Sequence, residues 1–106
     1  PQAPPTPMTL SPLPGPLFSP GRVVMASSVH HLVEGGLLNP TIYLKRHLAG
    51  DWGELTEDDK QANQQALKYG DRLFSGYDMD VDDEPRLWII TEADRSATTI
   101  MLPSDY

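Results

Sequence analysis

The chain has 106 residues, a length that suits one small domain with one modest hydrophobic core. It contains no cysteine, which excludes thiol nucleophiles, disulfides and cysteine-ligated metal centres. Fifteen acidic residues against eight basic ones give a net charge of −7, which disfavours direct binding to nucleic acid and favours a basic protein partner. Moderate negative charge also keeps a small protein soluble, so composition leaves both explanations open.

Residues 1–21 differ from the rest of the chain, because they hold eight of the eleven prolines and no charged residue. Proline can neither continue a helix nor donate a hydrogen bond to a sheet. We therefore expect a disordered Pro-rich leader over 1–21 that adds nothing to the core, followed by a single domain over 22–106. Spacings such as Pro4 to Pro7 also suit a groove that binds polyproline II helices, although a linker is the simpler interpretation.

No targeting signal or membrane span is predicted. The N-terminus lacks the basic and apolar regions of a secretory signal. No apolar run reaches the roughly 20 residues that a membrane span needs. We expect a cytoplasmic protein that does not bind membranes.

A short strand and three helices are predicted before residue 71. The strand covers 22–25, and Ser27 and Ser28 offer an N-cap for a short helix that ends at Gly35. Asn39 and Pro40 begin a second helix, which runs towards Gly50 with Leu44 and Leu48 on its buried side. Thr56 and three following acids begin a third helix over 57–70, with a buried stripe of Ala62, Ala66 and Tyr69.

After residue 71 the apolar period changes to 2, which predicts strands over 72–78, 86–92 and 98–102 in an antiparallel meander. The fold class is therefore α+β, with the meander packed on the helices. The side chains expected to face the helices are Leu87, Ile89, Ile100 and Leu102. Trp88 and Ile90 then lie on the opposite face, which is too apolar for water. We expect a homodimer or an added layer to cover it.

The segment 78–84 carries five acids and resembles the start of a calcium loop. A calcium site is not predicted, because Asp83 stands where glycine is needed and Ile89 where a bidentate glutamate is needed. A solvated acidic turn that meets a basic protein is the preferred interpretation, since residues 51–94 hold thirteen acids and four bases, a net charge of −9. The predicted partner-binding residues are Asp78, Asp80, Asp82, Asp83, Glu84, Asp94 and Trp88.

The histidines do not form a metal site, because His30 and His31 are neighbours that point about 100° apart on a helix and no third ligand follows them. No metal or cofactor is predicted. His47 precedes a turn that contains Asp51 and Trp52, which suits either a catalytic group or a histidine that stabilises the end of the second helix while Trp52 fills the core edge. The polar run 91–99 likewise suits either a site or a structural hairpin.

Two segments carry a resemblance to a known family: 47–55 (HLAGDWGEL) and 88–106 (WIITEADRSATTIMLPSDY). They resemble a family of small uncharacterised "plasmid-related" proteins from bacterial plasmids and integrated mobile elements, over roughly residues 21–106. The resemblance implies a role in maintenance, transfer or countering host defence. It leads us to expect a non-enzymatic acidic accessory protein that binds a basic host or element protein.

The order of elements also resembles the ribonucleases of the barnase, colicin and RelE types, whose sites lie on the sheet. This second resemblance implies an alternative, toxin-type ribonuclease. Its candidate residues are His47 as acid or base, Arg95 as phosphate clamp, and Thr98 and Thr99 as orienting hydroxyls. The acidic surface disfavours it, because such enzymes hold RNA on a basic surface.

Overall fold

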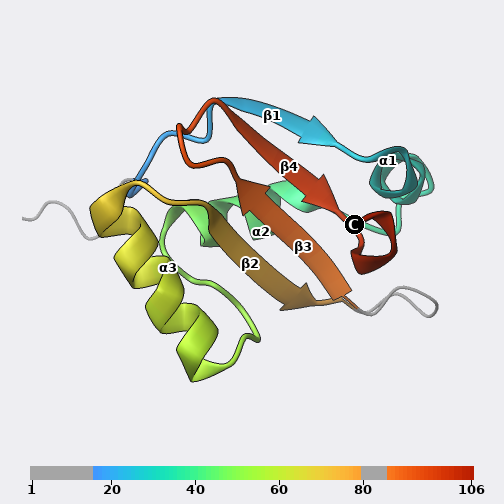
Figure 1. The fold of residues 1–106 in the computed structure, drawn as a ribbon. Coiled ribbons are helices and arrows are strands. Elements are labelled where there is room, and N and C mark those ends of the chain that lie inside the picture. The colour runs from blue at the N-terminus through green and yellow to red at the C-terminus, as the bar shows by residue number, and fades with distance from the viewer. Residues whose placement is uncertain (1–15, 80–85) are drawn as a thin grey trace, which may run out of the picture.

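A computed structural model describes residues 16–79 and 86–106, and it confirms the α+β class (Figure 1). The elements follow the predicted order, with a short 3₁₀ helix added after the last strand. Their bounds are β1 Arg22–Met25, α1 Ser27–Glu34, α2 Pro40–Leu48, α3 Glu57–Tyr69, β2 Leu73–Asp78, β3 Arg86–Thr91, β4 Ala97–Met101 and η2 Pro103–Asp105.

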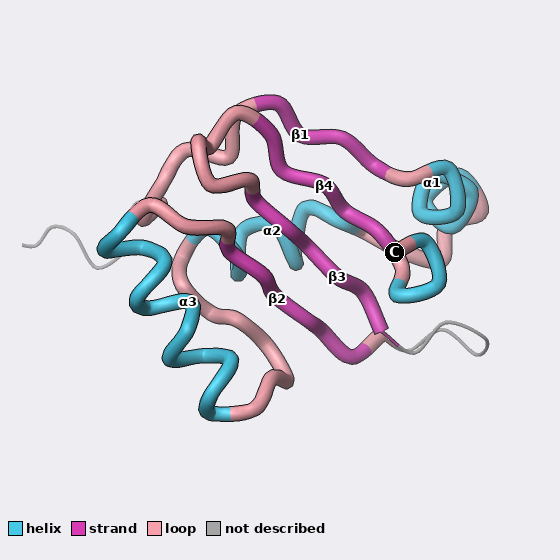
Figure 2. The backbone as a smooth tube through the Cα atoms, viewed as in Figure 1, coloured by secondary structure: helices cyan, strands magenta, loops and turns pink. Residues whose placement is uncertain are grey.

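The four strands form one mixed sheet in the order β1-β4-β3-β2 (Figure 2). The predicted antiparallel meander is present, with Asp78 opposite Arg86 and Thr91 opposite Thr98. β1 pairs with β4 in parallel, a pairing that the sequence pattern did not predict. The parallel arrangement requires a long crossover, and α1, α2, α3 and two strands provide it.

The helix ends follow their capping residues at α2 and α3. Asn39 accepts a hydrogen bond from the Thr41 amide at 3.2 Å, and Thr56 accepts one from the Asp59 amide at 3.2 Å. Gly70 ends α3 with a φ of 78°, a conformation that glycine adopts without strain. The predicted serine cap of α1 is wrong, because Ala26 occupies that position without a side-chain bond. Ser28 lies inside α1 and instead donates to Asp105.

The main core lies between the sheet and the first two helices. Figure 1 views the sheet from its other face, with α2 behind the strands. Val29 of α1 and Tyr43 of α2 pack against the strand residues that were predicted to face the helices, which are Leu87, Ile89, Ile100 and Leu102. Trp88 and Phe74 lie on the face of the sheet away from this core, where both are half-buried and Tyr106, which follows η2, packs against Trp88.

The outer edge of β2 is covered by α3 and by the segment before it. Asn63 accepts from the Phe74 amide at 3.0 Å and donates to the Phe74 carbonyl at 2.6 Å. The backbone of Gly76 likewise forms hydrogen bonds, here with the backbone of residues 52–54. The predicted buried stripe of α3 is confirmed at Ala66 and wrong at Ala62 and Tyr69, which are exposed, whereas Asn63 is buried. The covered edge cannot pair with another chain.

Residues 16–21 contact the domain, contrary to the expectation that the whole leader adds nothing to the core. The Leu17 amide donates to the Leu48 carbonyl at 2.8 Å. Phe18 packs against a second cluster of Trp52, Ala66 and Leu73. The remainder of the predicted leader, residues 1–15, lies outside the described residues.

The two hydrogen bonds between Asn63 and the Phe74 backbone of β2 generate a stability prediction. Asn63→Ala leaves both polar groups of the Phe74 backbone without their partner, and we expect it to lower the free energy of unfolding by about 1–3 kcal/mol. The exposed neighbour Gln64 provides the control, because Gln64→Ala should change stability by less than about 0.5 kcal/mol. Urea denaturation measures both, and equal effects of the two substitutions would contradict the structural role of Asn63.

Candidate functional site

His47 of α2 is completely buried and joins three strands through a chain of hydroxyl groups. Its Nδ1 lies 2.6 Å from the Ser75 hydroxyl, and its Nε2 lies 2.9 Å from the Thr91 hydroxyl. Thr91 and Thr98 are 2.7 Å apart, and Thr98 donates to the Pro20 carbonyl at 2.8 Å. A hydroxyl and imidazole network therefore connects α2 with β2, β3, β4 and the segment before β1.

The hydrogen bond from Thr98 to the Pro20 carbonyl sets the direction of the other hydrogen bonds in this network. Thr98 has one hydroxyl proton and gives it to Pro20, so it accepts from Thr91. Thr91 in turn accepts from the N–H at Nε2 of His47, and Nδ1 accepts from Ser75. The geometry assigns the neutral Nε2–H tautomer to His47.

The surroundings of His47 keep the imidazole neutral. Burial, together with the positive charge of Arg95, lowers its pKa to about 4. Phe18 and Trp52 contact the ring edge-on, with centroids 5.3 and 5.8 Å away. The interpretation of Trp52 as a core residue is confirmed. His47 does lie in the last turn of α2 as expected, but it is buried and its pKa is lowered, so it places no charge at the helix end.

The other residues of the ribonuclease alternative are not brought together on an accessible surface. Arg95 donates to the carbonyls of Ala66, Asp71, Glu92 and Ala93, and so ties the end of α3 to the β3–β4 turn. Thr98 is buried in the His47 network. Thr99 follows Thr98 in β4 and lies on the opposite face of the sheet, where it pairs with Ile90. An RNA phosphate has no access to His47, and the guanidinium of Arg95 is already engaged.

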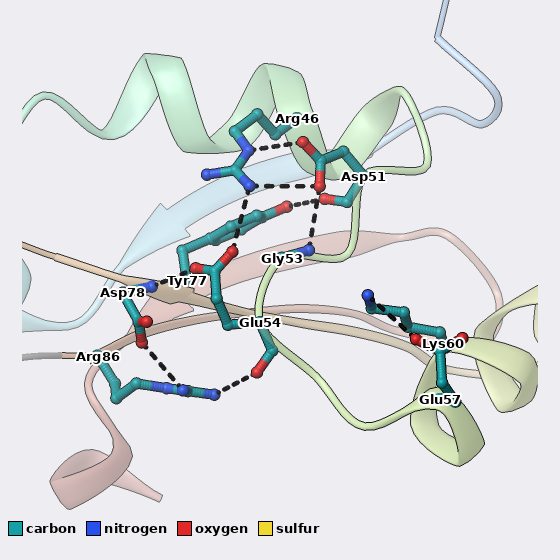
Figure 3. A network of polar contacts seen from close by, with 9 residues as sticks. All are labelled: Arg46, Asp51, Gly53, Glu54, Glu57, Lys60, Tyr77, Asp78 and Arg86. Carbon is teal, nitrogen blue, oxygen red and sulfur yellow. Dashed lines mark hydrogen bonds and ion pairs between the residues drawn. The ribbon is translucent and has the colours of Figure 1, made fainter.

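A second polar network lies where α2 and the 51–54 turn meet β2, and Figure 3 shows its residues at close range. Arg46 forms an ion pair with Asp51 at 2.7 Å and another with Glu54 at 3.6 Å, and its guanidinium lies 4.6 Å from the centre of the Tyr77 ring. The hydrogen bond to Asp51 raises the pKa of Arg46, and the same bond lowers the pKa of Asp51. Tyr77 donates to the Asp51 carbonyl at 2.7 Å. This arrangement holds the turn onto the sheet.

The first predicted partner-binding residue, Asp78, belongs to the same network. It accepts from Arg86 at 3.0 Å, and its amide donates to Glu54 at 2.7 Å. Arg86 also donates to the Glu54 carbonyl at 3.0 Å (Figure 3). The predicted residues Asp80, Asp82, Asp83 and Glu84 lie outside the described residues.

Asp94, another predicted partner-binding residue, lies at the opposite end of β3 from Arg86, the strand residue next to the acidic loop. The loop follows β2, whereas Asp94 follows β3 and lies at the other end of that strand (Figure 1). Six strand residues separate the two ends by roughly 20 Å. Asp94 is exposed and accepts from the Ser96 amide at 2.9 Å. Hydrogen bonds to Ser96 lower the pKa of Asp94 and are typical of a structural turn.

Trp88 forms the centre of a hollow of about 300 Å³ on the face of the sheet away from the main core. The hollow is lined by Arg72, Phe74, Trp88, Ile90 and Tyr106, which we call the aromatic pocket. Phe74 and Tyr106 both meet the Trp88 ring edge-on, at 5.1 and 5.8 Å between centroids. Sequence periodicity identified Trp88 and Ile90 but missed Phe74 and Tyr106. Phe74 was recoverable from the same period, since it pairs with Ile90.

Neither a metal centre nor a membrane span is found in the described parts of the chain. No group of three or more His, Cys, Asp and Glu side chains among these residues is placed to hold a metal ion. His30 and His31 are both exposed, and His30 lies 3.4 Å from Glu34 on the same helix. No helix over residues 16–79 or 86–106 has the length and hydropathy to cross a bilayer.

Comparison with protein-family models, with curated proteins and with solved structures gives no match for this chain.

The neutral, buried imidazole predicts a pH dependence of stability. The pKa of His47 is about 4 in the folded chain and about 6.5 in the unfolded chain, so the unfolded chain binds more protons between these values. The contribution of neutral His47 to the free energy of unfolding is fully present above pH 6.5 and is lost as the pH falls towards 4. We expect the free energy of unfolding to fall by about 2 kcal/mol from pH 7 to pH 5.

Urea denaturation at the two pH values measures this loss. A double variant of the exposed histidines, His30→Gln with His31→Gln, is the matched control and should keep the full loss. If the double variant removes the pH dependence, His47 is not its source.

Proposed function

We propose that this protein is a non-enzymatic, acidic binding protein that captures a basic protein partner. The acidic loop that follows β2 supplies the charge, and Asp78 anchors the loop. The aromatic pocket around Trp88 supplies apolar contact area on the neighbouring face of the sheet.

One observation carries this proposal: the bases nearest the acidic loop already have carboxylate partners. Asp78 and Arg86 are paired across the strands and form the base of the loop, 3.0 Å apart. Arg46 is engaged by Asp51 and Glu54. The segment 80–85 brings four more acids and no base. A run of acids of this kind favours a cationic surface, and charge complementarity speeds association and selects the partner.

The positions of the titratable groups support binding over catalysis. His47 has no exposed surface, and both ring nitrogens are occupied by hydroxyl groups. The guanidinium of Arg95 donates hydrogen bonds to four backbone carbonyls. The aromatic pocket contains no residue pair suited to acid–base or nucleophilic chemistry, because its polar members are Arg72 and the phenol of Tyr106.

The biological setting of the proposal rests on the resemblance of residues 47–55 and 88–106 to plasmid-related proteins. An acidic protein encoded on a mobile element suits the inhibition of a host protein that binds nucleic acid. Such a partner presents a basic surface, and an acidic inhibitor competes for that surface by charge.

Neutralising the loop should weaken partner binding. We expect the triple substitution Asp80→Asn, Asp82→Asn and Asp83→Asn to reduce affinity for a partner captured from host lysate and to flatten the dependence of that affinity on salt. Fewer charges leave less attraction for salt to screen. Titration calorimetry over a range of salt concentrations measures both effects, and circular dichroism checks the fold.

The matched control removes the same number of charges elsewhere. Asp58, Asp59 and Asp71 are exposed and lie on and after α3, so changing all three to Asn alters the net charge equally. This control should retain most of the affinity. If the two triple variants lose the same affinity, the partner responds to the overall negative charge of the protein and not to the acidic loop in particular. Cleavage of added RNA that is abolished by Arg95→Ala would instead establish the ribonuclease alternative.

A further inference from the structure

The outer edge of β1 has backbone groups that bond to no described residue. β1 is the terminal strand of the sheet and pairs with β4 along its inner edge (Figure 1). The amides of Arg22 and Ala26 donate to carbonyls on the β4 side, at 3.0 and 2.9 Å. Because alternate residues of a strand bond to the same neighbour, Val24 also bonds to β4, whereas Val23 and Met25 direct their N–H and C=O groups outward. Within the described ranges, no backbone group bonds to these two residues on the outer side.

The side chains at this edge are apolar and partly exposed. Val23 is 40% exposed, and Met25 is 38% exposed. Their register partners in β4 are Thr98 and Ile100, which are buried on the helix side of the sheet. Since paired residues of neighbouring strands point to the same face, Val23 and Met25 extend this core face to its margin. A strand added here would cover apolar surface and also satisfy the outward backbone groups.

The opposite edge of the sheet is already occupied. At the β2 edge, the backbone of Phe74 bonds to Asn63 of α3, and that of Gly76 bonds to residues 52–54. A sheet with two free edges adds copies without end, whereas a sheet with one free edge closes after two copies. The fold therefore suits a closed dimer that uses the β1 edge of each copy.

The order of residues in β1 is self-complementary. In an antiparallel arrangement about a two-fold axis at Val24, Val23 lies opposite Met25 of the second copy. Residues opposite each other at such a position exchange both of their backbone hydrogen bonds, so all the outward groups of Val23 and Met25 find partners. Val24 then lies opposite Val24 of the second copy, at the closer position where β-branched side chains pack well.

Charge favours this antiparallel register over a parallel one. Arg22 is the charged residue of β1. The two-fold axis at Val24 places Arg22 opposite Ala26 of the second copy, and the two arginines are then roughly 13 Å apart along the strands. Parallel pairing in register would place the two arginines side by side, where like charges destabilise a sheet.

We propose that two copies of this chain pair through the outer edges of β1, antiparallel about Val24, and so join their sheets into one. The edge is short, so its contact area falls below the roughly 1,200 Å² of a standard interface, and we expect a weak, concentration-dependent dimer. This goes beyond the proposed function, because it does not depend on the acidic loop or its partner. It also differs from the homodimer predicted through Trp88 and Ile90, which would use a face of the sheet and not its edge.

Charge substitutions at the two outward positions test this pairing. Val23→Lys with Met25→Lys places like charges opposite each other, and we expect it to raise the dissociation constant of the dimer at least about tenfold. Val23→Lys with Met25→Glu places a lysine opposite a glutamate, and we expect its dissociation constant to stay within about threefold of that of the unmodified chain. Sedimentation equilibrium of the full chain from about 10 μM to 1 mM measures these constants for a weak dimer. Circular dichroism checks that each variant folds.

The control adds the same two lysines outside β1. Leu37 and Ile42 are exposed apolar residues, so Leu37→Lys with Ile42→Lys changes the net charge equally and should leave the dimer intact. Three results would each overturn the proposal. The first is a chain that stays monomeric at the highest concentration. The second is a dimer that the pair of lysines at positions 23 and 25 leaves intact, because such a dimer uses another surface. The third is an equal loss in this variant and in the control or the Lys–Glu variant.

Discussion

The structure depends on a buried histidine that must stay neutral. His47 connects α2 to the three strands of the meander, and the hydroxyl of Thr98 extends the connection to Pro20. Every proton in this network has one acceptor, so no polar group is left unpaired along it. A fully satisfied polar network specifies one arrangement of helices and strands, because any shift leaves a buried donor or acceptor without a partner. It also removes His47 from any role that needs contact with a ligand.

The polar networks and the aromatic pocket lie on different faces of the sheet. On the helix side, Arg95 and His47 serve backbone and hydroxyl partners, and Arg46 secures the 51–54 turn. On the opposite side, Phe74 and Trp88 form an apolar surface with a paired ionic rim. His47 and Arg95 therefore both serve the fold, and the proposed binding function rests on other surfaces of the molecule.

Local signals in the sequence predicted the elements well. Asn39 before Pro40 and Thr56 before three acids placed two helix starts correctly, because a cap acts on the residues next to it. Strand alternation also placed the core residues Leu87 and Ile89, because each strand is half buried.

Interactions between distant residues were less accessible to prediction. Asn63 looked like a surface residue of α3, and nothing in its neighbourhood indicates that it pairs with the edge of β2. The parallel placement of β1 and the position of Asp94 at the far end of β3 depend on topology. The candidate site was predicted in part. Strand alternation identified Trp88, whereas its neighbour Tyr106 reaches Trp88 only because η2 folds back onto the sheet.

The most direct test of the central claim is the protonation state of the His47 ring in the folded chain. Nitrogen-15 resonances of the imidazole report the tautomer and follow its titration. We expect the neutral Nε2–H form of His47 to persist from pH 7 down to pH 5. Titration of His47 near pH 6.5, or a signal of the Nδ1–H tautomer, would contradict the buried network on which the account rests.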